Sequence, residues 1–133
     1  MRRPLLLSRY LPPDSAVTTY RLCLVVYQES PGLWIGRGVE HDLTAEGKTI
    51  SETVRAVLRM VNAHAAFDIR HSRPPLSAFR PAPQPYWNAF SSGTPVPLAE
   101  LGALAPEHWD VAVAIARQRP AESRFSHHAI SLG

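Results

Sequence analysis

Residues 18–27 predict a β-strand because hydrophobic residues repeat there with a period of two. Every second residue from Tyr20 to Val26 is apolar and forms one face. The alternate positions from Arg21 to Tyr27 form the other face, and most of them are apolar as well. A strand that is apolar on both faces is expected in the middle of a well-covered sheet.

Two further strands are predicted after this one. Residues 28–32, Gln-Glu-Ser-Pro-Gly, carry turn residues and predict a hairpin into a strand over residues 33–40. Gly36 and Gly38 lie on one face of that strand, which favours a bulge or a close approach of another backbone. A short third strand is predicted from Leu43 to Gly47, where a glycine ends it.

A helix is predicted from Thr49 to Ala66 by its start signal and its periodicity. Thr49 and Glu52 have the spacing of a capping box, in which each side chain accepts a hydrogen bond from a backbone amide of the first turn. Apolar residues then recur at helical spacing on one face: Ile50, Val54, Val57, Leu58, Val61 and Ala65. Polar residues occupy the opposite face.

The second half of the chain has a different composition. Residues 68–97 are rich in proline, which favours extended structure and surface contacts. We predict an arm here, with residues 86–90 packed on another surface as a short helical turn. Pro106 suits the first position of a helix, and Trp109, Val113 and Ala116 give that helix an apolar edge, so a second helix is predicted that stops before Pro120.

These elements predict an α+β fold in which one helix packs on an antiparallel sheet of three to four strands. The chain divides into a partly ordered leader (1–17), a core domain (18–67), a proline-rich arm (68–97), and a C-terminal helix and tail (98–133). An exposed edge on so small a sheet is a liability, so a second copy, the arm or a partner's strand is expected to cover it.

Composition limits the classes of function. A net charge of +3 over 133 residues permits contact with nucleic acid but does not argue for it. Cys23 is the one cysteine, which excludes an internal disulfide and fits a reducing cytosol. The apolar run at residues 5–7 is too short for a signal peptide, and no window reaches the length of a membrane span. We therefore expect a cytoplasmic protein without a membrane partner.

The order of these elements carries a family resemblance. The residues that carry it are Tyr20-Arg-Leu-Cys-Leu-Val-Val-Tyr, Leu33-Trp-Ile-Gly, Glu40-His-Asp-Leu, Thr44-Ala-Glu-Gly and Thr49-Ile-Ser-Glu-Thr-Val. Over residues 18–66 the chain resembles the HicB-like domain of bacterial toxin–antitoxin pairs. In that family two strands form a hairpin, and a third ends in a glycine before a helix that lies across the sheet.

The resemblance implies a non-catalytic antitoxin whose partly degraded ribonuclease-H-like domain binds and masks a small ribonuclease toxin. It also implies a homodimer or larger oligomer, with operator DNA bound by a separate C-terminal module. Two features differ from the family pattern. The run from Glu40 to Leu43 lacks the Pro-Gly-Cys that the family often carries there, and the C-terminal half lacks adjacent helices. The chain is therefore expected to be a solitary or divergent member.

Candidate chemistry is sparse. Glu40, His41 and Asp42 form the one dense group of side chains able to bind a metal, but adjacent residues at a strand end point in different directions. A metal-dependent nuclease built on these three residues is the third-ranked function. Cys23 lies between leucines with no histidine beside it, which favours an inert, buried thiol. We expect no catalytic residue, no metal and no cofactor.

Two surfaces are candidates for binding. The leading expectation is a protein-partner surface formed by the glycine face and the arm, with Trp34, Tyr86, Trp87 and Phe90 as the contact residues. The alternative is a nucleic-acid-binding module, or a subunit of a larger assembly, that uses Arg21, Arg37, Arg55 and Arg59.

Overall fold

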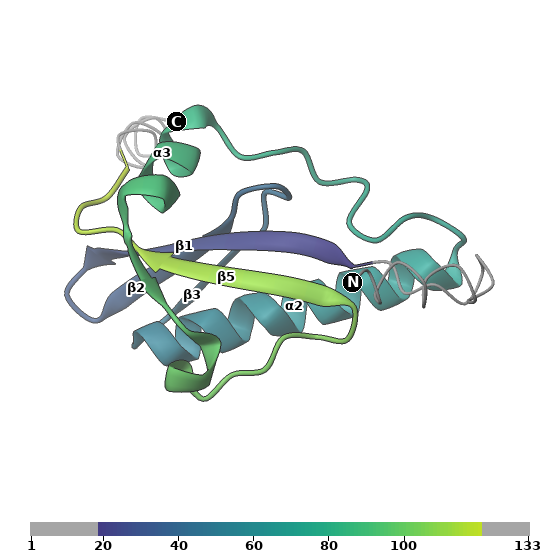
Figure 1. The fold of residues 1–133 in the computed structure, drawn as a ribbon, viewed down its shortest axis with the longest axis horizontal. Helices are drawn as coiled ribbons and strands as arrows, with labels where there is room; N and C mark the ends of the chain where they lie inside the picture. Colours follow the sequence, from purple (N-terminus) through teal and green to yellow (C-terminus); the bar gives the residue numbers. More distant parts are fainter. Residues whose placement is uncertain (1–18, 121–133) are drawn as a thin grey trace, which may run out of the picture.

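The computed structural model describes residues 19–120, which form an α+β fold around one five-stranded sheet (Figure 1). The strands lie in the order β3-β2-β1-β5-β4. Their bounds are β1 Tyr20–Ser30, β2 Leu33–Gly38, β3 Thr44–Gly47, β4 Thr94–Val96 and β5 Trp109–Ile115. The predicted α+β class is confirmed. The predicted leader (1–17) and the tail from residue 121 onward lie outside the described residues.

Strand β1 lies at the centre of the sheet, as its two apolar faces predict. It pairs antiparallel with β2 and parallel with β5, so the sheet is mixed. The prediction of three to four antiparallel strands is therefore wrong in size and in direction. The sheet takes β4 and β5 from the part of the chain that was predicted to be an arm and a C-terminal extension, so it extends beyond residues 18–67.

The predicted second helix is wrong, because residues 109–115 form β5. Trp109, Val113 and Ala116 match a helical period, but Trp109, Val111 and Val113 also alternate with Asp110 and the alanines that follow. The segment forms a strand because it pairs in parallel with β1 over seven residue pairs, from Tyr20–Trp109 to Val26–Ile115. Because β1 is about ninety residues away in the sequence, residues 109–115 carry no local sign of this pairing.

Helix α2 (Ile50–Arg70) covers one face of the sheet (Figure 1). Thr49 caps its start by accepting a hydrogen bond from the Glu52 amide (3.1 Å), while the Glu52 carboxylate accepts one from the Lys48 amide (2.7 Å). The capping residues were therefore predicted, although Glu52 reaches Lys48 and not Thr49. The helix runs one turn beyond its predicted end.

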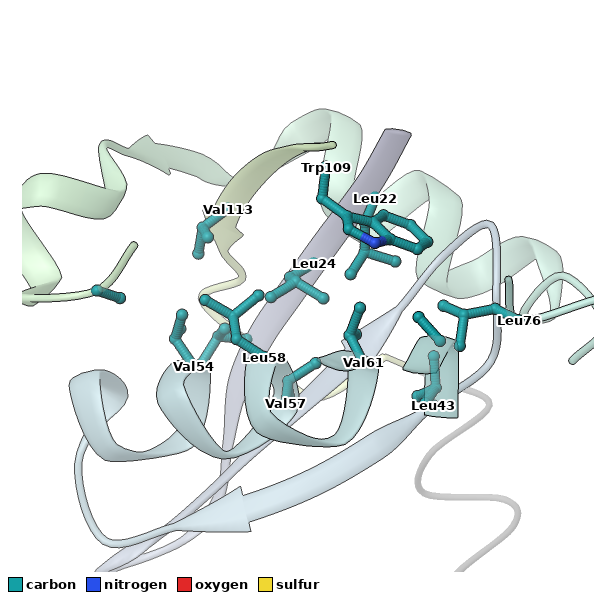
Figure 2. Packing of buried hydrophobic residues seen from close by; sticks show 13 residues of the cluster. Leu22, Leu24, Leu43, Val54, Val57, Leu58, Val61, Leu76, Trp109 and Val113 are labelled. Carbon is teal, nitrogen blue, oxygen red and sulfur yellow. The ribbon is translucent and has the colours of Figure 1, made fainter. Parts of the chain in front are cut away.

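The main core lies between α2 and the sheet. Figure 2 shows Leu22 and Leu24 of β1 facing Val54, Val57, Leu58 and Val61 of α2, with Trp109 and Val113 of β5 beside them. Gly36 of β2 permits this packing, since a Cβ at this position would lie 2.9 Å from Cγ2 of Val57. The backbone approach predicted for this glycine face occurs at Gly38, where the carbonyl of His41 comes close, whereas side chains of α2 approach Gly36.

The proline-rich segment begins against the main core, where Leu76 and Phe79 pack, and then crosses to the opposite face of the same sheet. Its backbone crosses the end of β2, where Arg80 O accepts from the Asp42 amide (2.8 Å) and the Ala82 amide donates to Val39 O (2.9 Å). Helix α3 (Gln84–Ser92) follows and contributes Tyr86 to a second core cluster with Val25 and Tyr27. The predicted packing of residues 86–90 as helix is confirmed. The segment is part of the fold and does not form a free arm.

A short 3-10 helix η2 (Leu98–Leu101) and a loop connect β4 to β5. They return the chain to the α2 side of the sheet, where Leu98 and Leu101 pack against the main core. Within residues 19–120, no helix has the length and apolar character needed to cross a membrane.

Candidate binding surface

The exposed face of α2 presents two arginines that are one turn apart. The buried stripe of α2 turns Val54, Leu58 and Val61 toward the sheet, which leaves Arg55 and Arg59 on the solvent side. Residues four apart on a helix are neighbours on its surface, so the two guanidinium groups serve one area. Among residues 19–120, neither has a carboxylate within 4.0 Å.

A hollow of about 320 Å³ lies between this face of α2 and the loop that follows η2. We call it the α2 hollow. Its lining residues are Arg55, Leu58, Arg59, Asn62, Gly102, Ala103, Leu104 and Pro106. Gly102 turns the chain at φ +63°, a conformation that favours glycine, and thereby ends η2 beside the helix.

The two walls of the α2 hollow differ in character. Arg55 donates a hydrogen bond from Nη1 to Leu101 O (3.2 Å), which fixes its guanidinium at the end of η2. Leu104 on the opposite wall is 88% exposed. The hollow therefore offers cationic donors on one side and an apolar side chain on the other.

The arginines of the nucleic-acid alternative are not brought together by the fold. Arg21 is exposed on β1 and pairs with Asp110 at 3.6 Å. Arg37 is half-buried on β2, forms two hydrogen bonds with Asp42 (2.6 and 2.9 Å), and lies 3.9 Å from the centre of the Tyr86 ring. Only Arg55 and Arg59 share a surface.

The aromatic residues of the protein-partner prediction serve mainly to hold the fold. Tyr86 is fully buried, so the prediction that it contacts a partner is wrong. Trp34 lies partly buried against the main core on the α2 face, where α2 covers Gly36 and the residues His41 and Leu22 cover Gly38. Trp87 donates from Nε1 to Ala82 O (2.9 Å), and Phe90 packs partly on the second cluster. Trp87 and Phe90 keep some exposed surface.

The possible nuclease residues point to separate partners. Glu40 accepts a hydrogen bond from the Cys23 amide (2.7 Å) and so continues the β1–β2 ladder beyond the end of β2. Asp42 accepts a hydrogen bond from Arg37. The ring of His41 lies edge-on to that of Trp109, with the ring centres 6.1 Å apart. Among residues 19–120, no three side chains of the types that bind metals gather around one point.

Cys23 has the environment of an unreactive thiol. The side chain is buried in the centre of the sheet. Burial, with a further contribution from the Glu40 carboxylate, raises the pKa of Cys23 to about 11. A thiol with such a pKa is protonated near neutral pH and is a poor nucleophile, as its sequence context predicts.

The sequence indicated Arg55 and Arg59 but missed Asn62, Gly102 and Leu104. Gly102 and Leu104 follow η2, and no helical or strand pattern nearby predicts that the chain lies against α2 at this point. The one available sign was the apolar run from Leu101 to Pro106, which matches neither a helical nor a strand period. In comparisons with protein-family models, curated proteins and solved structures, the chain has no match.

Proposed function

We propose that this protein is a non-catalytic binding protein that masks a small protein partner in the manner of a HicB-type antitoxin. The observation that carries the proposal is the α2 hollow, where two guanidinium groups without carboxylate partners among residues 19–120 lie beside the exposed Leu104. Exposed cationic and apolar groups around one concave surface are typical of a binding site.

The order of the elements supports the family part of the proposal. β1 and β2 form a hairpin, β3 ends at Gly47, and a capped helix packs across the sheet. These features agree with what the resemblance over residues 18–66 implies. A small ribonuclease toxin is accordingly the first partner to test, in a cytoplasmic setting that fits the unpaired Cys23.

A homo-oligomer is part of the same proposal. Strand β3 lies at one edge of the sheet and is only four residues long, while β4 at the other edge is three residues long and contains Pro95. Short edges and proline discourage uncontrolled strand pairing. Specific pairing of two copies through β3 is the form of dimer that this sheet would permit.

Binding of nucleic acid is the second candidate, favoured by the same two arginines. Since Arg21 and Arg37 are paired elsewhere, Arg55 and Arg59 would contact about two phosphates, which predicts a slope of log K against log salt of about −1.8 for duplex DNA. Such a footprint gives weak binding. The protein partner therefore ranks first.

The test is capture of partners from the native host by the tagged full-length chain, with and without nuclease treatment, read by mass spectrometry. We expect a small protein that is retained after nuclease treatment. When expressed separately, it should re-form a stoichiometric complex with this chain and lose its own activity in that complex. Retained nucleic acid without a protein would favour the second candidate, and metal-dependent cleavage abolished by Asp42→Ala would contradict both.

A further inference from the structure

The positive charges that line the α2 hollow determine which charge a bound group must carry. Arg55 and Arg59 both line the hollow, and their Cβ atoms lie about one helical turn apart, or roughly 6 Å. Guanidinium groups bind carboxylates and phosphates by paired hydrogen bonds. The occupant must therefore bring at least one anionic group to this side of the hollow.

Arg55 is held in position before anything binds. Its hydrogen bond to Leu101 O uses one of five guanidinium N–H donors and leaves the others available. The Gly102 turn places the backbone close to this group, since a Cβ on Gly102 would lie 3.7 Å from Nη1 of Arg55. A fixed donor costs less side-chain entropy on binding than a free one.

The apolar wall requires a second property of the occupant. Leu104 is almost fully exposed, whereas Leu58 at the base of the hollow is only 6% exposed. A side chain inserted between them would cover the exposed leucine and extend the core outward. Asn62 lies next to Arg59 along the rim, and its amide can donate to and accept from a peptide backbone.

A protein segment fits these properties better than a nucleic acid does. Among residues 19–120, no aromatic side chain lines the α2 hollow, so this part of the chain offers no surface there on which a base could stack. Glu100 and Glu107 are exposed on the same connection and would repel a phosphate backbone that continued past the two arginines. A volume of about 320 Å³ suits one or two side chains.

We propose that the α2 hollow binds a protein segment in which an aspartate or glutamate flanks a large apolar residue. The carboxylate pairs with Arg55 and Arg59, and the apolar side chain inserts between Leu58 and Leu104. This inference rests on the proposed binding function and names the local chemistry of the partner. The acidic residue is required only in the bound segment, so the partner as a whole can carry either net charge.

The test uses a phage library of random twelve-residue peptides, selected on the immobilised full-length protein. Enriched peptides are synthesised with a fluorescent label, and their Kd is measured by anisotropy. We expect enrichment of peptides that combine Asp or Glu with Leu, Ile, Phe or Met. Replacing their acidic residues by Asn or Gln should weaken binding at least about tenfold, the usual effect of losing a charge-assisted hydrogen bond.

Two variants locate the site, and one serves as the control. Arg59→Glu and Leu104→Ser should each weaken binding of the selected peptides by about tenfold or more. Arg80→Glu makes the same change in net charge at an exposed residue on the opposite face of the sheet, so it should leave the Kd within about twofold. Since Arg59 and Leu104 are both exposed, neither variant should unfold the protein.

Three outcomes would overturn the inference: no enrichment, enrichment of basic or uncharged peptides, or selected peptides that bind Arg59→Glu as tightly as the wild type. A labelled single-stranded RNA of twenty nucleotides that binds more tightly than the peptides and loses affinity in Arg59→Glu would assign the hollow to nucleic acid. A host partner captured equally by wild type and Arg59→Glu would end this inference while leaving the proposed binding function intact.

Discussion

Asp42 accepts two hydrogen bonds from Arg37, at 2.6 Å from Nε and 2.9 Å from Nη2. The pair is half-buried, and the guanidinium also lies over the ring of Tyr86. Burial is the largest single influence and opposes the charge of Arg37, but the hydrogen bonds to Asp42 and the charges of Tyr86, Asp42 and Tyr27 together outweigh it and raise the pKa of Arg37. The pair therefore joins the end of β2 to α3 and gives Asp42 a structural role.

Replacing Asp42 by Asn should destabilise the fold because it leaves the Arg37 charge half-buried without its counter-ion. The expected loss in the free energy of unfolding is about 1–3 kcal/mol, measured by urea denaturation. Asp110→Asn is the matched control, since its partner Arg21 is well exposed and such pairs contribute about 0–1 kcal/mol. Equal effects of the two changes would contradict the structural role of Asp42.

Cys23 predicts a specific loss of stability at alkaline pH. An unfolded thiol ionises near pH 9, whereas burial raises the pKa of Cys23 to about 11 in the folded state. The contribution of the protonated thiol is fully present below pH 9 and is lost as the pH rises from 9 to about 11, because the unfolded state ionises first. The free energy of unfolding should fall by about 2 kcal/mol over this range.

The measurement is urea denaturation of wild type and Cys23→Ala at several values between pH 7.5 and 10.5. The two proteins differ only at residue 23, so the informative quantity is the difference between the two curves. We expect that difference to shrink as the pH rises. Parallel curves would show that the thiol does not contribute.

The sequence predicted those parts of the fold whose signals are local. The apolar faces of β1 and the capped stripe of α2 each lie within about twenty residues, and both agree with the structure. β5 was mispredicted because the segment fits two periods: Trp109, Val113 and Ala116 match a helical one, while Trp109, Val111 and Val113 match a strand one. Its pairing with β1, about ninety residues away, decides between them. Arg37 was named as a candidate nucleic-acid contact, and its place over the Tyr86 ring could not be predicted because Tyr86 is far from it in the sequence.

The candidate site was predictable only in its helical half. Arg55 and Arg59 could be placed on the outer face of α2 because the stripe fixes that face. Leu104 could not be placed beside them, since its position depends on the turn at Gly102 and on the return of β5 to the sheet. Tyr86 was expected at a surface because a proline-rich run usually lies there, yet the second face of the sheet needed covering.

Gly47 should not tolerate a side chain. A Cβ at this position would lie 2.6 Å from Oγ1 and 2.8 Å from the backbone nitrogen of Thr53, in the first turn of α2. Gly47→Ala must therefore move β3 away from the helix and should cost about 2–4 kcal/mol by thermal or urea denaturation. Gly32→Asn is the control: nothing lies within 4 Å of the added Cβ, and asparagine tolerates a positive φ. It should cost less than about 1 kcal/mol.

Asp68 holds the turn that follows α2. Its buried carboxylate accepts a hydrogen bond from the Leu76 amide (2.8 Å) and lies 3.4 Å from Nη2 of Arg73. Asp68→Ala would leave the amide of a fully buried leucine unsatisfied, at a cost of about 2–3 kcal/mol. Asp68→Asn keeps one acceptor oxygen and should cost about half as much. Hydrogen exchange of the Leu76 amide should accelerate strongly in the alanine variant, and unchanged protection would refute this role.

Replacement by alanine should change the free energy of unfolding by very different amounts at the two leucines of the α2 hollow. Leu58 belongs to the main core, so Leu58→Ala should lower the free energy of unfolding by about 2–4 kcal/mol. Leu104 is exposed, so Leu104→Ala should alter it by less than about 0.5 kcal/mol. Urea denaturation of both variants at neutral pH makes the comparison. A stability loss above about 1 kcal/mol for Leu104→Ala would mean that this side chain already packs within its own fold, and a partner would then have no exposed leucine to cover.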